Sequence, residues 1–196
     1  ALAKARDNET GNHIIRTQLY VKAIAHRLFK NGHYLEYLND KTIHLMYRAA
    51  PLHDVGKIGI PDKILLKKGR LTEDEFITMK THALIGESVL KSVVEDGKEG
   101  YSELVQIAMK IAGGHHEKWN GTGYPRGLMG QEIPIEARIM AVADVYDALV
   151  SERVYKKGWS HEKAFSNICE QSGIQFDPLV VEAFVAEEEN FKEIAA

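Results

Sequence analysis

Cysteine is nearly absent from this sequence, which contains a single one among its 196 residues. An internal disulfide framework is therefore excluded, and the composition suits a reducing compartment. Cys169 lies in an amphipathic stretch with Phe165 and Ile168, so we interpret it as a buried structural thiol and not as a nucleophile. We expect the protein to be cytoplasmic.

The sequence also lacks long hydrophobic runs and an excess of positive charge. No stretch of about 18 apolar residues occurs, so we expect no membrane span in this segment. The formal net charge of -3 argues against nucleic-acid binding, which needs a basic face. Any phosphate group must then be recognised by a few local cations and by metal ions.

Alternating strand patterns are missing as well, whereas helical patterns cover nearly the whole chain. Asn31-Gly32 ends the first helical pattern, and Pro51 is expected to kink the second helix just before His53. Thr72 and Glu75 form a capping box that starts a third helix. The predicted helices cover residues 10–30, 41–54, 72–80, 82–95, 102–115, 135–150, 160–172 and 178–190.

The segments between these helices are predicted to be loops. Residues 57–70 contain Pro61 and Gly69, and residues 117–134 contain four glycines and two prolines. A loop of the second length inside a compact domain is usually functional or disordered. Since there is no repeat and no break in composition, the sequence predicts one all-α domain over residues 1–196.

Histidine and aspartate stand out within segments that are otherwise apolar. They form a nitrogen- and oxygen-donor set without cysteine, which suits iron, manganese or zinc, and more than four donors suggest more than one ion. Two ions a few ångströms apart can clamp the attacking and leaving oxygens of a phosphate ester. The set therefore favours a metal-dependent phosphohydrolase. Its members are His13, His53, Asp54, His82, His115, His116 and Asp144.

Each of these residues also has an ordinary structural interpretation. An unpaired carboxylate at Asp144 in the apolar segment IMAVADVYDALV would need a cation, unless Asp144 shares an exposed polar face with Asp147. Lys57 follows Asp54 by three residues and is a candidate partner for a simple salt bridge. His13, four residues after Glu9 on a predicted core face, would by itself be interpreted as a core histidine with one hydrogen bond.

Two ordered segments, HDVGKIGIP at 53–61 and HHEKWNGTGYP at 115–125, resemble the HD-GYP group of the HD phosphohydrolase superfamily. The resemblance extends from Glu9 to Pro178. It implies a single bundle of about seven helices around a buried centre of two or three divalent ions, with iron or manganese expected. The implied ligands are Glu9, His13, His53, Asp54, His82, His115, His116 and Asp144, with Asp54 bridging two ions and Glu9 serving a third.

The resemblance also implies a substrate, cyclic di-GMP, which is opened to pGpG and often cut further to GMP. Asp54 and Lys57 are then the catalytic residues, with Lys57 at the scissile phosphate. Tyr124 of the GYP tripeptide is expected to contact a guanine or a phosphate, although a loop tyrosine that packs against the bundle is the alternative. Arg153 and Lys156 resemble phosphate-contacting residues, but Val154 stands where the family usually has proline.

Two other functions fit the same residues. One is hydrolysis of another nucleotide, such as a mixed cyclic dinucleotide, and the other is a signalling module that binds cyclic di-GMP or a GGDEF-domain protein with little catalysis. The chain starts at Ala1 within a helical pattern. We therefore expect a fragment in which residues 1–12 end a linker helix from an N-terminal receiver or sensory domain.

Overall fold

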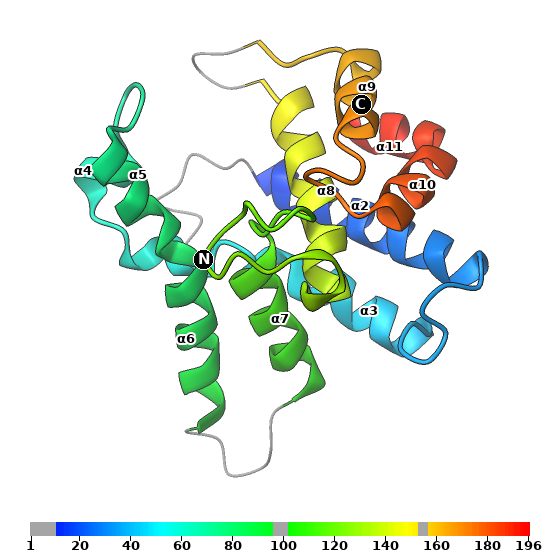
Figure 1. The fold of residues 1–196 in the computed structure, drawn as a ribbon, viewed down its shortest axis with the longest axis horizontal. Helices are drawn as coiled ribbons and strands as arrows, with labels where there is room; N and C mark the ends of the chain where they lie inside the picture. The colour runs from blue at the N-terminus through cyan, green and yellow to red at the C-terminus, as the bar shows by residue number, and fades with distance from the viewer. Residues whose placement is uncertain (1–10, 96–101, 153–156) are drawn as a thin grey trace.

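The computed structural model describes residues 11–95, 102–152 and 157–196, and within these ranges it contains helices and no β-strand (Figure 1). The predicted all-α class is therefore confirmed. The elements are α2 (Gly11–Lys30), α3 (Asp40–Ala49), η1 (Ala50–Leu52), η2 (Val55–Gly59), α4 (Asp62–Leu65), α5 (Glu73–Lys80), α6 (His82–Glu95), α7 (Glu103–Gly114), η3 (Gly130–Glu132), α8 (Ile135–Val150), α9 (His161–Glu170), α10 (Pro178–Ala186) and α11 (Glu188–Ala195), where η marks a 3-10 helix.

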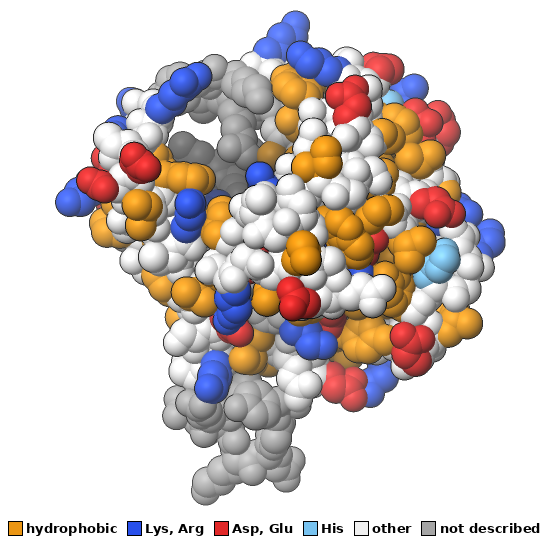
Figure 2. All heavy atoms as spheres, in the orientation of Figure 1, with side chains coloured by type: hydrophobic (Ala, Val, Ile, Leu, Met, Phe, Trp, Pro, Cys, Tyr) orange, Lys and Arg blue, Asp and Glu red, His pale blue; other side chains and the backbone are white. Residues whose placement is uncertain are grey.

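Helices α2 and α8 form the middle of the bundle. Helix α2 packs against α3, α8 and α10, while α7 packs against α3, α6 and α8. Helices α9, α10 and α11 lie together on one side, and α4 and α5 form a lobe on the other (Figure 1). Charged and apolar side chains lie next to one another over that lobe (Figure 2). Among the described residues, no helix has the length and apolar character needed to cross a membrane.

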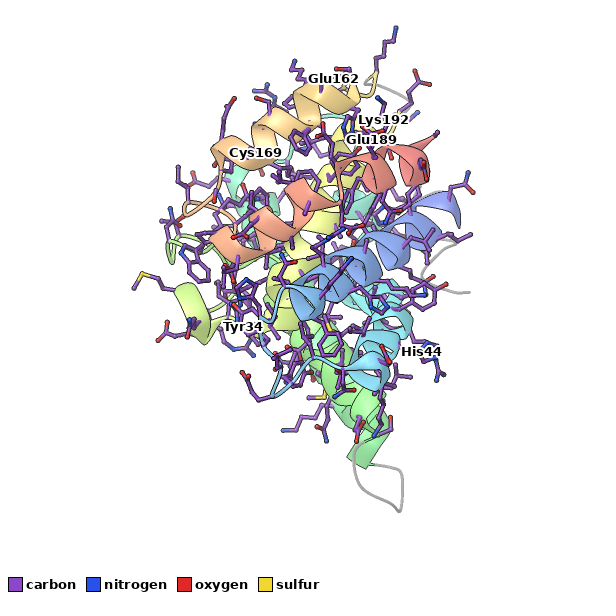
Figure 3. The ribbon with its side chains drawn as sticks, turned by 90° about the vertical axis from the view of Figure 1, so that its right-hand side faces the viewer. Tyr34, His44, Glu162, Cys169, Glu189 and Lys192 are labelled. Carbon is purple, nitrogen blue, oxygen red and sulfur yellow. The ribbon has the colours of Figure 1, made fainter. Side chains whose placement is uncertain are left out.

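Buried aromatic side chains fill the core between α2, α8, α10 and α11. Tyr20 stacks on Phe191 with 4.4 Å between ring centroids, and Tyr146 lies edge-on to both rings. Residues on the outer faces point away from this core, as His44 does on α3 (Figure 3). Cys169 is half-buried and packs against the core, and burial raises the pKa of its thiol. Both observations fit a structural thiol.

The helix starts follow the sequence signals. Thr72 and Glu75 form the predicted capping box at the start of α5, and the Asp177 side chain accepts a hydrogen bond from Leu179 N at the start of α10. These side chains satisfy backbone N–H groups that have no partner within the helix.

Three boundaries differ from the sequence prediction. Pro51 lies in a separate 3-10 turn after α3 ends at Ala49, because its ring excludes the backbone geometry of a continuing α-helix. The predicted loop at 57–70 contains the end of η2 and the single turn α4. The predicted helix at 178–190 is two helices that meet at Glu187, whose carboxylate lies 2.5 Å from Arg27 of α2.

Gly56 allows η2 to approach α6 more closely than any other residue would. A Cβ atom at this position would lie 2.0 Å from His82 O and 2.3 Å from Gly86 N, and both of these are backbone atoms. Asp54, which directly precedes η2, and His82, which is the first residue of α6, are both candidate ligands. The contact at Gly56 therefore sets the spacing between two parts of the candidate site.

We expect Gly56→Ala to lower the free energy of unfolding by about 3 kcal/mol, because the added methyl group forces η2 and α6 apart. Chemical denaturation measures this change. Ser88→Ala, at an exposed position of α6, is the control and should stay within about 0.5 kcal/mol of the unsubstituted protein. A Gly56→Ala variant as stable as that control would show that the close approach is dispensable.

Candidate metal centre

Two adjacent groups of side chains gather where α2, α6, α7, α8 and the 3-10 turns meet. Within each group, one potential ligand atom from every residue lies within 4.8 Å of the others. All the predicted ligands that lie in the described ranges belong to one group or the other, whereas Glu9 lies outside the described residues. The first group is Asp54, His82, His115 and His116, and the second is His13, His53 and Asp144.

Most of these side chains come from the ends of helices. His53 and Asp54 follow η1, and His115 and His116 follow α7, while His82 is the first residue of α6. At a helix end the backbone changes direction, so that adjacent residues can point into the same space. Within a continuous helix, neighbouring side chains would diverge by about 100°.

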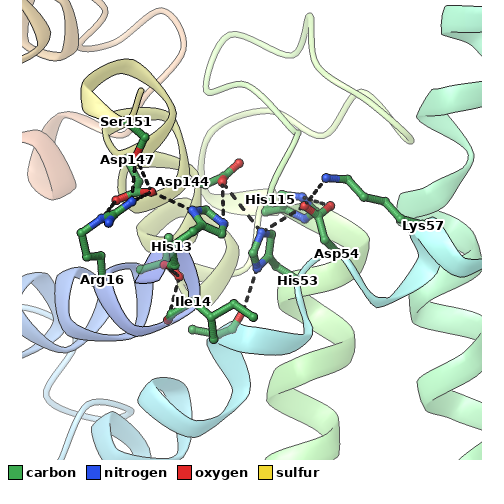
Figure 4. Close-up of polar contacts among 12 residues, drawn as sticks. His13, Ile14, Arg16, His53, Asp54, Lys57, His115, Asp144, Asp147 and Ser151 are labelled. Atoms are coloured by element: carbon green, nitrogen blue, oxygen red, sulfur yellow. Dashed lines mark hydrogen bonds and ion pairs between the residues drawn. The ribbon is translucent and has the colours of Figure 1, made fainter. Parts of the chain in front are cut away.

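Asp54 connects the two groups, with one carboxylate oxygen facing each (Figure 4). Its Oδ1 atom lies 3.2 Å from His82 Nε2 and 3.8 Å from His115 Nε2. Its Oδ2 atom lies 3.2 Å from His53 Nε2, and His53 Nε2 lies 3.8 Å from Asp144 Oδ1. A carboxylate in this position is suited to bridge two cations.

The histidine rings are fixed by hydrogen bonds on the side away from the centre. The Nδ1 atoms of His53, His82 and His115 donate to the backbone carbonyls of Ala50, Met79 and Ile111 at 2.8, 2.7 and 3.0 Å. A neutral imidazole that donates through Nδ1 has its lone pair on Nε2. Each ring therefore presents an acceptor atom to the centre, which is the arrangement that metal-binding histidines use.

The protonation states agree with metal binding. Burial and the neighbouring His82 lower the pKa of His116 to about 3, and burial together with His116 lowers the pKa of His115 well below its usual value. Both rings are thus neutral at pH 7. Burial opposes ionisation of Asp54, but its neighbours His53, His82 and Lys57 hold the pKa of this carboxyl well below its usual value.

The distances between ligand atoms also fit a shared ion. His82 Nε2 and His116 Nε2 lie 3.1 Å apart. Two ligands at about 2.1 Å from one ion and at right angles to each other are separated by about 3.0 Å. His115 Nε2 is buried and has no hydrogen-bond partner among the described residues. A cation would satisfy these lone pairs, and the buried cluster therefore suits divalent metal ions.

His13 is oriented by Asp147, which the sequence analysis considered only in the alternative of an exposed polar face shared with Asp144. That alternative is wrong, because Asp147 is only 1% exposed. Its carboxylate accepts a hydrogen bond from His13 Nδ1 at 2.8 Å and from Arg16 Nε at 2.6 Å (Figure 4). Asp144, one turn earlier on α8, faces the metal-ligand group instead, with its Oδ1 3.9 Å from His13 Nε2.

The glycine-rich loop is held by a second residue that the sequence reasoning missed, Glu117. Its buried carboxylate accepts hydrogen bonds from Arg126 N at 2.7 Å and Leu128 N at 3.1 Å. Gly123 crosses the backbone of Glu117 so closely that a Cβ atom would lie 2.6 Å from it. This folding of the loop brings the ring of Tyr124 onto His116, with 4.7 Å between the centroids and 25° between the planes.

Of the three basic residues predicted to contact phosphate, only Lys57 lies in the part of the chain that the structure describes. Lys57 Nζ lies 2.8 Å from Asp54 Oδ2, so the salt bridge considered from the sequence is present, and its side chain is 22% exposed at the edge of the centre. A contact to substrate phosphate is compatible with this position and stays a prediction. Arg153 and Lys156 lie outside the described residues.

We expect Asp147→Ala to reduce the free energy of unfolding by about 2–4 kcal/mol, because Arg16 and His13 lose a buried partner. The hydrogen bonds from His13 and Arg16 outweigh burial and lower the pKa of Asp147. The contribution of the Asp147 carboxylate to the free energy of unfolding is therefore present above pH about 4, and it is lost as the pH falls through this lowered pKa. Denaturation at several pH values measures both effects.

Lys41→Ala is the control for Asp147→Ala, because it removes the exposed ion pair between Lys41 and Glu103. Its effect on the free energy of unfolding should be below about 1 kcal/mol. An Asp147→Ala variant with equally small loss would contradict the structural role of the buried carboxylate.

Comparison with known proteins gives a family for this arrangement. The model of the HD domain family matches residues 13–180. A Vibrio cholerae protein named "Cyclic di-GMP phosphodiesterase" is 56% identical over 196 residues, which are 100% of this chain and 39% of that protein. A second V. cholerae protein, named "Probable cyclic di-GMP phosphodiesterase", is 53% identical over 195 residues, or 100% of this chain and 44% of that protein.

A solved structure shows the same fold. The crystal structure of a cyclic GMP-AMP specific phosphodiesterase from V. cholerae superimposes with a TM-score of 0.65 at 21% sequence identity. The match covers 99% of this chain and 49% of that chain. The present chain thus spans about two fifths of the length of the curated relatives it matches.

Proposed function

We propose that this chain, which belongs to the HD-GYP group of the HD domain family, hydrolyses the phosphodiester bonds of cyclic di-GMP with the help of bound divalent metal ions. The observation that carries the proposal is the partly buried Asp54 carboxylate, whose two oxygens face two separate groups of histidine and aspartate ligands. The names of the two V. cholerae relatives supply the substrate.

The metal ions would be held by the two groups of side chains. Asp54 Oδ1, His82, His115 and His116 would bind one ion, and Asp54 Oδ2, His53, His13 and Asp144 would bind the other. We propose iron or manganese, since the donors are imidazole nitrogens and carboxylate oxygens, and a third ion if Glu9 adds its carboxylate. When bound, the ions would activate water and neutralise charge on the phosphate.

The remaining residues would orient the substrate. Water adds to phosphorus, one phosphorus–oxygen ester bond breaks, and the linear product pGpG leaves, to be cut a second time into GMP. The Lys57 ammonium, partly exposed beside Asp54, would donate to an oxygen of the scissile phosphate and stabilise the charge that develops there. Tyr124 would contact the nucleotide beside His116, and we propose Arg153 and Lys156 as contacts to phosphate.

The cellular setting is also a proposal. We infer a cytoplasmic signalling protein in which residues 1–196 form one HD-GYP domain and residues 1–12 end a linker helix. An N-terminal receiver or sensory domain would provide the input, and GGDEF-domain proteins are candidate partners. The greater length of the relatives, of which this chain matches 39% and 44%, is compatible with additional domains.

We expect Asp54→Ala to abolish hydrolysis of cyclic di-GMP and to remove at least one bound ion per chain, since both ligand groups lose a shared carboxylate. Turnover is followed by chromatography of pGpG and GMP, using protein purified anaerobically and supplied with Fe(II) or Mn(II). Metal content is measured on the same samples by elemental analysis.

Asp40→Ala is the control, because Asp40 is an exposed aspartate at the start of α3. It should retain both the metal ions and turnover. Hydrolysis by Asp54→Ala at the rate of this control would refute the proposed centre, and the absence of hydrolysis in the unsubstituted protein with either metal would refute the proposed activity.

We expect Lys57→Met to lower kcat about 100-fold while leaving the metal content unchanged, because the ammonium acts on the phosphate and does not bind the ions. The control is Lys63→Met, at an exposed lysine of α4, which should retain kcat. If Lys57 serves only as a salt-bridge partner of Asp54, kcat will stay within a few-fold of that of the control.

A further inference from the structure

Helix α5 places a phenylalanine and a lysine against Tyr124. The rings of Phe76 and Tyr124 are nearly perpendicular, with 6.4 Å between their centroids and 80° between their planes. Lys80, one helical turn after Phe76, has its Nζ atom 4.8 Å from the Phe76 centroid and 5.6 Å from the Tyr124 centroid. Neither Phe76 nor Lys80 belongs to the residues predicted from the sequence.

These residues extend the metal centre toward the surface. Tyr124 stacks on His116 and Phe76 contacts Tyr124, so Phe76 is two ring contacts away from a candidate metal ligand. Phe76 is nevertheless 46% exposed. It lies on the α4–α5 lobe, where apolar and charged side chains meet (Figure 2). A large aromatic ring beside a proposed active centre is therefore accessible to a bound molecule.

The chemistry of this pair fits a purine base. Proteins that bind unpaired nucleotides stack the bases on aromatic side chains, and each such contact contributes substantially to affinity. Guanine carries two acceptors on one edge, O6 and N7, to which lysine donates, whereas adenine has an amino group in place of O6. An exposed aromatic ring with an ammonium group over it, 4.8 Å from the ring centroid, offers both interactions.

We propose that Phe76 and Lys80 form a nucleobase subsite next to the metal centre, in which Phe76 stacks on a guanine and Lys80 donates to its O6 and N7 atoms. This proposal rests on the proposed function, because it assigns a place to one base of the cyclic dinucleotide. It adds a determinant of the choice between guanine and adenine that lies on α5 and outside both ligand groups.

Binding of two small ligands to the metal-loaded protein isolates the contribution of the base. GMP and ribose 5-phosphate share a phosphorylated ribose, but only GMP has a base, so the ratio of their dissociation constants reports base recognition. We expect GMP to bind about 10-fold more tightly than ribose 5-phosphate. In Phe76→Ala this advantage should fall to less than about 2-fold, and in Phe76→Trp it should be retained. Calorimetry measures these constants without requiring turnover.

Ile77→Ala is the matched control. Ile77 is the next residue of α5 and is 56% exposed, but it points about 100° away from Phe76 around the helix. The variant removes a similar exposed apolar side chain and should keep the 10-fold advantage. If Phe76→Ala and Ile77→Ala reduce the advantage of GMP over ribose 5-phosphate equally, the effect on α5 is a general one and the subsite is overturned.

Lys80→Met tests the choice of base. We expect the unsubstituted protein to bind GMP about 10-fold more tightly than AMP, and Lys80→Met to bind the two within about 2-fold. An unchanged ratio would overturn the role of Lys80.

An unsubstituted protein that hydrolyses cyclic di-GMP while Phe76→Ala keeps the full GMP advantage would overturn the subsite alone. A protein that prefers GMP through Phe76 but hydrolyses no cyclic di-GMP would overturn the proposed activity and leave the subsite standing.

Discussion

The structure depends on the burial of a set of lone pairs that face one another. His53, His82 and His115 each donate a proton outward to a backbone carbonyl, so their remaining ring nitrogens converge on the Asp54 carboxylate. Such acceptor atoms repel one another unless positive charge lies between them. Binding of cations at this point would therefore be coupled to packing of the surrounding helices, and its free energy would contribute to that of folding.

The scaffold positions the ligands through a few contacts between segments that are distant in sequence. The absence of a side chain at Gly56 sets the spacing between η2 and α6, and the ion pair of Arg16 with Asp147 joins the start of α2 to α8. Asp54 precedes η2 and His82 begins α6, whereas His13 and Asp144 lie on α2 and α8. These two contacts therefore position ligands of both groups.

The helices and the side chains that gather at the candidate centre were largely predictable, because periodicity and residue type are properties of the local sequence. His115 and His116 follow a helix whose apolar pattern ends in two glycines, and both are recognisable as donors. The buried position of Asp147 could not be predicted because its partner Arg16 is 131 residues away, and periodicity identifies a face but not what covers it. Glu117 and the contact of Phe76 with Tyr124 were missed for the same reason, since they arise from the folding of a loop and the docking of a lobe. Glu9, Arg153 and Lys156 lie outside the described residues, and the roles of all the site residues stay predictions.

His13 of α2 donates a hydrogen bond to Asp147 of α8 at 2.8 Å, and its Nε2 atom lies 3.9 Å from Asp144, also of α8. One of the two ligand groups is therefore complete only where α2 and α8 are docked against each other. By thermodynamic reciprocity, an ion bound by that group would strengthen the contact between α2 and α8, and a change that weakens this contact would lower the affinity for that ion by the same factor. The affinity of one position in the centre for its ion would thus depend on how firmly α2 is docked against α8.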